Sequence, residues 1–155
     1  MMGEGTGMDI QWDNVVKAVA AVGGAIAGAF GGWSMQLSVL LYFMAADYLT
    51  GLVVAWMGKS PKTETGGPSS KVGFQGILKK MLMVGLVFAA AQVDKAMGSG
   101  TFLVRDAAVW FYLANEGLSI LENMTFAGVP FPKRIKDLLG HIKEENDSES
   151  DMAEK

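Results

Sequence analysis

Asp47 is a carboxylate near the middle of residues 37–57, a run that is otherwise apolar and long enough to cross a bilayer. A charge in hydrocarbon costs about 2.5–3.5 kcal/mol on insertion scales, so such a side chain usually faces a helix bundle, a partner or water. Three further apolar segments surround this run, and two of them also carry ionisable residues. The pattern predicts an integral membrane protein whose helices meet through buried polar groups.

A polar face is predicted along residues 101–123. Its members recur at offsets of three, four and seven, the spacing of neighbours on one side of an α-helix. A membrane helix with such an edge either seals it inside protein or wets it in a water-filled lumen, and both states are compatible with the sequence. The predicted pore or assembly face, including acids on the preceding spans, comprises Asp47, Asp94, Arg105, Tyr112, Asn115, Glu116, Ser119, Glu122 and Asn123.

Asp94 and Arg105 stand at nearly equal distances from the centre of the short turn at residues 98–100. In an antiparallel hairpin they would lie at similar depth, so we expect a salt bridge that offsets part of their insertion cost. The alternative is that both side chains reach the outer interface and contact water.

Asp47 and Glu116 have no cation at an obvious matching depth. Three states would accommodate them: protonation, hydrogen bonds to Asn115 or Ser119, or pairing with a partner subunit. This pair is the strongest residue-level indication of function in the sequence.

A glycine recurs every fourth residue at Gly24, Gly28 and Gly32. A stripe without side chains lets two helix backbones approach closely, which promotes helix association in lipid. The stripe predicts a helix-packing face, either between copies of the chain or against the second span.

Four membrane spans are predicted at residues 15–33, 37–57, 81–97 and 101–123. Each is near the ~20 residues that a ~30 Å hydrocarbon core requires. Short turns join the first pair and the last pair, so the spans form two hairpins of an all-α membrane domain covering residues 15–123. The third span is the shortest, and a re-entrant or strongly tilted hairpin of the last two is the competing interpretation.

Basic residues set the predicted orientation. The connecting loop at residues 58–80 holds five lysines and one acid, and further basic residues follow the last span. By the positive-inside rule both segments are cytoplasmic. Four crossings then place both termini on the cytoplasmic side of the membrane.

The segments outside the membrane domain are a leader at residues 1–14 and a tail at residues 124–155. After Pro130 and Pro132, apolar residues recur at helical spacing opposite basic ones, which predicts a short amphipathic helix on the inner membrane surface. A helix packed on the protein's own loops fits the pattern equally well. The acid-rich end is typical of a disordered segment.

Several chemistries have no support in the sequence. There is no cysteine, and His141 is the single histidine, so neither a thiol site nor a multi-histidine metal site is expected. No phosphate-binding glycine loop and no nucleophile with a matching base is present. Membrane topology alone explains the lysine-rich loop, so we expect no nucleic-acid partner. Because none of these site types is present, we also expect no cofactor and no enzymatic activity.

Motifs along residues 40–139 resemble those of a known family. The most specific is the segment at residues 115–123, followed by a Gly-x-Pro-x-Pro element at residues 128–132. The other matching residues are Asp47-Tyr48-Leu49-Thr50-Gly51, Ser69-Ser70-Lys71, Gly73, Gly76, Lys79-Lys80, Asp94 and Arg105. Together they are similar to the toxin-secretion/phage-lysis holin family, which includes clostridial phage holins.

The resemblance implies a non-enzymatic pore former that oligomerises with itself in membrane lipid. Such proteins open large lesions that release an endolysin, or in relatives a secreted toxin. We expect no direct contact between the pore former and the protein that it releases. The alternatives are a small ion channel or proton-coupled transporter with Asp47 and Glu116 as its relay, or an antiholin regulator. Alternative starts at Met1, Met2 and Met8 would be compatible with the last of these.

Overall fold

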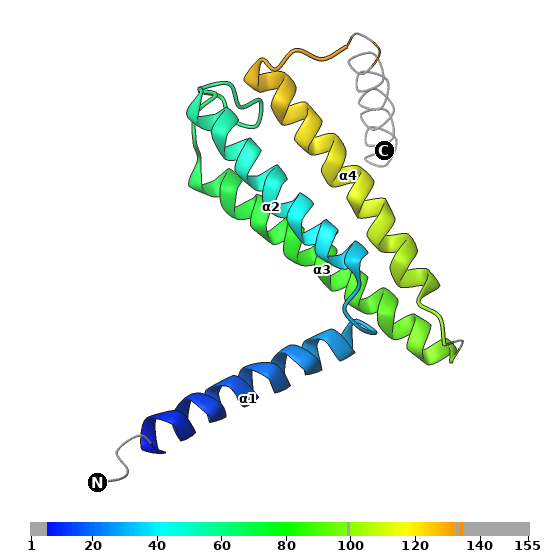
Figure 1. The fold of residues 1–155 in the computed structure, drawn as a ribbon. Helices are drawn as coiled ribbons and strands as arrows, with labels where there is room; N and C mark the ends of the chain where they lie inside the picture. The colour runs from blue at the N-terminus through cyan, green and yellow to red at the C-terminus, as the bar shows by residue number, and fades with distance from the viewer. Residues whose placement is uncertain (1–5, 99, 133, 135–155) are drawn as a thin grey trace.

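The computed structural model describes residues 6–98, 100–132 and 134, and side chains from residue 12 onward. These residues form four α-helices and no strand, as expected for an all-α chain: α1 Thr6–Ala29, α2 Met35–Trp56, α3 Ser70–Met97 and α4 Leu103–Ala127 (Figure 1). At 1.5 Å per residue, even α2, the shortest, is about 33 Å long.

Local sequence explains where the helices begin and end. Ser34 has extended backbone angles and its hydroxyl accepts a hydrogen bond from the Leu37 amide (3.2 Å), so it caps the start of α2. Gly98 and Gly128 end α3 and α4 in the left-handed conformation that glycine adopts without strain. Polar caps and glycines therefore divide an apolar chain into separate helices.

Helices α2, α3 and α4 form a bundle, and α4 packs most extensively on α2, which is not its neighbour in sequence. The apolar core lies in the half of the bundle nearer the α3–α4 turn. Its buried members are Leu37, Leu40, Met44, Met83, Val87, Val109 and Leu113. The predicted hairpin of the last two spans is present as α3 and α4, and α2 completes the bundle.

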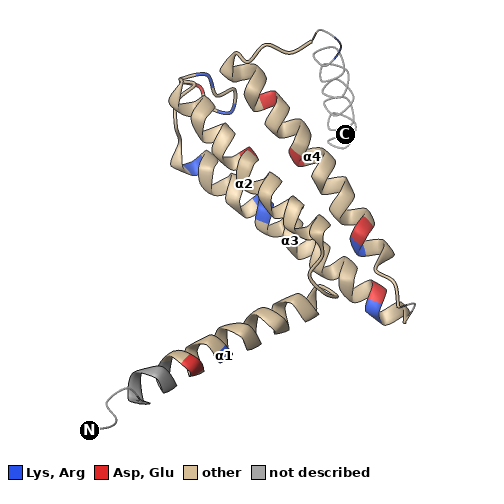
Figure 2. Ribbon diagram, viewed as in Figure 1, with Lys and Arg blue, Asp and Glu red and all other residues tan. Residues whose placement is uncertain are grey.

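The bundle has large apolar side chains outside and charged ones inside. Trp56, Leu82 and Phe111 are 70%, 75% and 68% exposed, whereas Arg105 and Glu116 are only 6% and 2% exposed. Most of the ribbon in Figure 2 carries no charge. Such an outer surface suits lipid better than water.

Among the described residues, α2 and α3 are long and apolar enough to cross a membrane, with mean hydropathies of 1.8 and 1.6. The two remaining helices do not meet the same criterion, so the predicted four spans are not confirmed. Helix α3 also begins at Ser70, well before the start of the predicted third span at residue 81. The lysines expected in the loop at residues 71, 79 and 80 are part of this helix.

Helix α1 leaves the bundle and extends away from it (Figure 1). Its side chains are exposed from Trp12 to Ile26, and its principal contact is with α3 near the α1–α2 turn. The first two predicted spans therefore do not pack as a hairpin. Residues 6–14 of the predicted leader belong to α1. The predicted amphipathic helix and acidic tail lie outside the described residues, apart from Pro132 and Arg134.

Candidate functional site

An ionic group at the middle of the bundle joins three helices. The Lys80 ammonium of α3 donates to the Asp47 carboxylate of α2 at 2.7 Å and also to the Glu116 carboxylate of α4. The three side chains are 16%, 14% and 3% exposed, respectively. The expectation that Asp47 and Glu116 lack a cation is therefore wrong. Lys80 lies inside α3 and not in a loop.

Asn123 extends this group. Its amide nitrogen donates to the Asp47 backbone carbonyl (3.1 Å), to the Asp47 carboxylate (3.0 Å) and to the Thr50 hydroxyl (3.0 Å). Gly51 lies beside it, since a Cβ there would be in van der Waals contact with the Asn123 amide nitrogen at 3.5 Å. We call Asp47, Thr50, Lys80, Glu116 and Asn123 the central cluster. It fastens α4 to α2 and α3 through side chains.

The central cluster has two carboxylates and one ammonium, so with all three ionised it carries one excess negative charge. Every buried side-chain polar atom in the described part of the chain has a hydrogen-bond partner. A fully bonded group of this kind tolerates a dry surrounding, whereas removing one partner leaves a buried charge. The central cluster therefore depends on all three helices staying together.

A cavity of about 390 Å³ adjoins the central cluster and lies between the three bundle helices and the α2–α3 loop. The ionic residues Asp47, Lys80 and Glu116 form one part of its wall. The loop residues Ser60, Lys62 and Ser69 contribute another. The cavity thus connects the middle of the bundle with its basic end.

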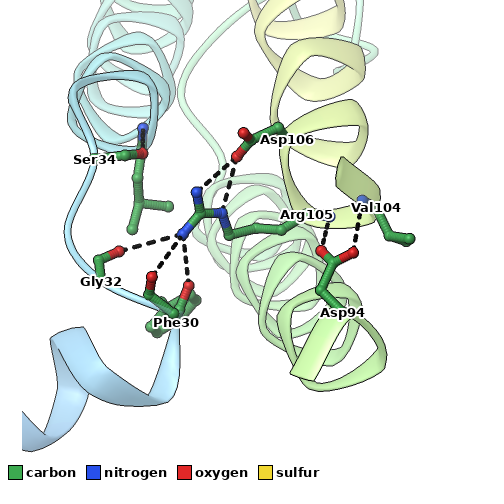
Figure 3. Close-up of polar contacts among 9 residues, drawn as sticks. Phe30, Gly32, Ser34, Asp94, Val104, Arg105 and Asp106 are labelled. Carbon is green, nitrogen blue, oxygen red and sulfur yellow. Dashed lines mark hydrogen bonds and ion pairs between the residues drawn. The ribbon is translucent and has the colours of Figure 1, made fainter. Parts of the chain in front are cut away.

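A second polar group lies at the opposite end of the bundle. The Asp94 carboxylate of α3 accepts hydrogen bonds from the backbone amides of Val104 (3.0 Å) and Arg105 (2.8 Å), as Figure 3 shows. It thereby satisfies the first amides of α4, which have no partner within their own helix. The predicted side-chain salt bridge between Asp94 and Arg105 is not among the ion pairs of the described residues. The two residues are neighbours, but the contact is carboxylate to backbone.

The Arg105 guanidinium points instead toward the end of α1 (Figure 3). It donates to the carbonyls of Phe30 (2.9 Å), Gly31 (3.3 Å) and Gly32 (3.4 Å) and pairs with Asp106 at 2.8 Å. These carbonyls belong to the turn directly after α1, which ends at Ala29, and a cation there stabilises the partial negative charge at the helix C-terminus. We call Asp94, Arg105, Asp106 and the carbonyls of residues 30–32 the end cluster.

Two side chains of α3 strengthen the attachment of α1. Lys95 donates to the carbonyls of Gly28 (2.8 Å) and Ala29 (2.9 Å), and Gln92 donates to that of Ala29 (2.6 Å). The last turn of α1 is thus held by polar contacts, while its remaining described side chains are exposed.

The other predicted face residues are distributed between the interior and the surface. Asn115 and Ser119 line the cavity, and Tyr112 packs against the apolar core. Glu122 is exposed. The predicted polar face of α4 is therefore mostly turned into the bundle, with Glu122 as its outward member.

The glycine stripe is only partly helical. Helix α1 ends at Ala29, and Gly32 lies in the following turn with a φ of +99°. A Cβ added at Gly24 or Gly28 would have no neighbour within 4 Å, so the stripe does not pack against the second span. Packing between copies of the chain stays a prediction.

The predicted site residues do not include Lys80, Gln92 or Lys95, although Lys80 belongs to the matching family motifs. Lys80 stands next to Lys79 in a lysine-rich stretch, which resembles a cytoplasmic loop. Its helical spacing from the apolar residues Met83 and Val87 was the available signal, since these three lie on one face. Within the described residues, no group of three or more acidic or histidine side chains is placed to hold a metal ion.

Comparison with known proteins identifies the family. The model of a family described as the bacteriophage holin family matches residues 24–144. A Bacillus phage phi105 protein named "Probable holin" is 35% identical over 115 residues, covering 74% of this chain and 79% of that protein. An uncharacterized 14.9 kDa protein of Clostridium perfringens is 34% identical over 130 residues, covering 83% of this chain and 93% of its own.

An uncharacterized protein of Listeria monocytogenes is 38% identical over 136 residues, covering 83% of this chain and 91% of that protein. No solved structure matches. The matched stretch contains the central cluster, the end cluster and the cavity, and it extends from the later part of α1 past the end of α4. The chain belongs to the bacteriophage holin family.

Proposed function

We propose that this protein is a holin that accumulates in the bacterial inner membrane, oligomerises and opens lesions through which an endolysin or a toxin leaves the cell. Family membership and the two apolar helices support a membrane protein with a holin role. The observation that carries the proposal furthest is the inverted bundle, with exposed Trp, Leu and Phe side chains around a buried ionic centre. It has the surface of a membrane protein and holds polar groups that water could reach after rearrangement.

In the proposed mechanism the described arrangement is the closed state. The polar face of α4 is covered by α2 and α3, and Lys80 neutralises one of the two central carboxylates. Neighbouring copies that offer alternative partners would shift the population toward an open state in which this face lines water. Glu122, already exposed, is placed to contact a second copy first.

The proposed topology has four crossings and cytoplasmic termini. Helix α1 has 24 residues, about 36 Å, which suffices for a crossing. Because the natural chain has no cysteine, single cysteines at Trp12 and after Lys155 can be tested with a membrane-impermeant thiol reagent. We expect protection of both in intact cells and labelling of both after permeabilisation. Labelling of the first site alone in intact cells would place α1 outside the predicted topology.

Induced expression tests the function directly. We expect an abrupt loss of membrane potential and growth, and lysis when a cytoplasmic muralytic enzyme is present. Harmless accumulation with an intact potential would contradict the proposal. Liposomes loaded with markers of graded size should release the protein-sized marker as well as the small ones.

A second candidate, a small ion channel, is favoured by the cavity that reaches Asp47 and Glu116. It predicts ion-selective flux with retention of every protein-sized marker, so the graded release assay separates the channel from the holin.

Variants Asp47→Leu and Glu116→Leu test the role of the central cluster in the proposed lesion. They should alter the time of lysis more than the amount of inserted protein. Unchanged timing in both would remove the central cluster from the lesion mechanism.

A further inference from the structure

The cavity beside the central cluster has charged residues that the proposed lesion mechanism does not use. Lys62 of the α2–α3 loop and Lys79 of α3 both line it, and both are exposed. Neither has an ion-pair partner among the residues that the structure describes. The three ionic residues of the cavity wall, in contrast, are already bonded to one another.

The lining therefore divides into an inner part, whose two carboxylates share one ammonium and leave one excess negative charge, and a positively charged outer part. The exposed residues Lys62, Pro68, Gln75 and Lys79 mark where the cavity opens. Helix α3 begins at the same place with no acid in its first turn, so its N-terminal dipole adds to the positive potential. An anion fits this opening by charge.

The surroundings of the opening indicate which anion. Exposed apolar side chains lie outside the cavity lining but in the same turns of the helices: on α3 Phe74, Ile77 and Leu78 are 61%, 44% and 42% exposed, and on α2 Trp56, next to the lining residue Ala55, is 70% exposed. A ligand held here would have its charged part against lysines and its remainder against apolar side chains. A soluble phosphate would leave this outer apolar surface of α3 and α2 uncovered, whereas the acyl chains of a phospholipid would cover it.

We propose that this cavity binds the headgroup of an anionic phospholipid, with its acyl chains lying along the outer surface of α3. A volume of about 390 Å³ is within the ~300–1,000 Å³ of small-molecule sites. Basic pockets between membrane helices at the cytoplasmic surface are suited to anionic headgroups. The proposal rests on the membrane placement given above and is independent of lesion formation.

The test measures lipid retained by the purified protein. The full chain is extracted from vesicles of phosphatidylcholine with 30% phosphatidylglycerol, washed in neutral detergent, and its bound lipid is quantified by mass spectrometry. We expect enrichment of phosphatidylglycerol over its share in the vesicles. The double variant Lys62→Ala/Lys79→Ala should bind phosphatidylglycerol about thirtyfold more weakly, because each lysine near an anionic headgroup raises the affinity by a factor of about five.

Two matched variants keep the test decisive. Lys59→Ala/Lys71→Ala removes the same charge from the same end of the bundle without touching the cavity lining, so it should retain the lipid. Val72→Trp keeps every charge but fills the cavity, so it should lose the lipid while circular dichroism shows unchanged helicity.

Three results would overturn the proposal. Equal retention of phosphatidylcholine and phosphatidylglycerol would exclude charge recognition. Equal losses in the two double-lysine variants would show general surface attraction instead of a site. Displacement of the lipid by millimolar inorganic phosphate or glycerol phosphate would identify a soluble anion as the ligand. Lesion formation can succeed or fail independently, because retention is measured without any release assay.

Discussion

The central cluster joins side chains of three helices to one another, whereas the end cluster joins side chains to backbone groups at helix ends. In the first, two carboxylates compete for one ammonium, and each of these two ion pairs crosses between helices. In the second, Asp94 and Arg105 satisfy amides and carbonyls that the helices leave unpaired. The contrast indicates that the end cluster maintains architecture, while the central cluster depends on how the helices are assembled.

The largest effect is expected for Lys80→Met. Asp47 and Glu116 would remain buried without a cation, and breaking a buried pair in this way costs about 3–5 kcal/mol. This loss of stability is measured as the change in the free energy of unfolding, from a titration of the purified protein with a denaturing detergent. Lys79→Met is the matched control: its side chain is exposed, so it should change stability by less than ~0.5 kcal/mol. Equal effects would remove the special role of the central cluster.

A smaller effect is expected for Arg105→Met. It removes charged hydrogen bonds that attach the end of α1 to the bundle, while the bundle itself keeps its core. Spin labels at Ala25 and Leu86, both exposed, should report a broader distance distribution. Arg105→Lys retains the charge but lacks the planar guanidinium, so the width of its distance distribution should lie between those of the unchanged protein and Arg105→Met. An unchanged distribution in Arg105→Met would show that other contacts orient α1.

Asp94→Ala should have a smaller effect still and lower the free energy of unfolding by about 0.5–2 kcal/mol. It removes an acceptor that caps the start of α4 but leaves the Arg105–Asp106 pair in place. Hydrogen exchange of the Val104 and Arg105 amides should accelerate. Asp94→Asn keeps one acceptor oxygen and should show a smaller change. A loss as large as that of Lys80→Met would mean that Asp94 acts through a side-chain ion pair after all.

The smallest effect is expected for Glu122→Gln, below ~0.5 kcal/mol, because this side chain is exposed. Glu116→Gln, on the same helix but buried against Lys80, provides the comparison and should be clearly destabilising. Similar unfolding midpoints for the two variants would contradict the distinction between the inward and outward members of the α4 face.

Much of the organisation could be predicted from the sequence. The all-α class, the polar face of α4 and the proximity of Asp94 to Arg105 follow from composition, helical periodicity and the symmetry of a short turn. The holin resemblance, which rested chiefly on residues 115–123, is confirmed by the family match. These features are local or nearly local, so spacing along the chain is sufficient to reveal them.

Helix boundaries and partners could not be predicted in the same way. A run of lysines next to prolines and glycines resembles a loop, but three of the five, Lys71, Lys79 and Lys80, lie in the first turns of α3. The position of Lys80 between Asp47 and Glu116 depends on α2 and α4 packing together across more than sixty intervening residues. No pattern within one segment contains that information.

The sequence by itself determined that charged side chains lie in apolar helices and must find shelter, because each one is costly in hydrocarbon. Tertiary structure decided which partner each charge takes. Lys80 binds two carboxylates, and the Arg105 guanidinium binds carbonyls of the turn after α1 instead of the Asp94 carboxylate. The physical reason is that hydrogen bonds and ion pairs act over about 3 Å, whereas the residues that form them here are brought together only by packing.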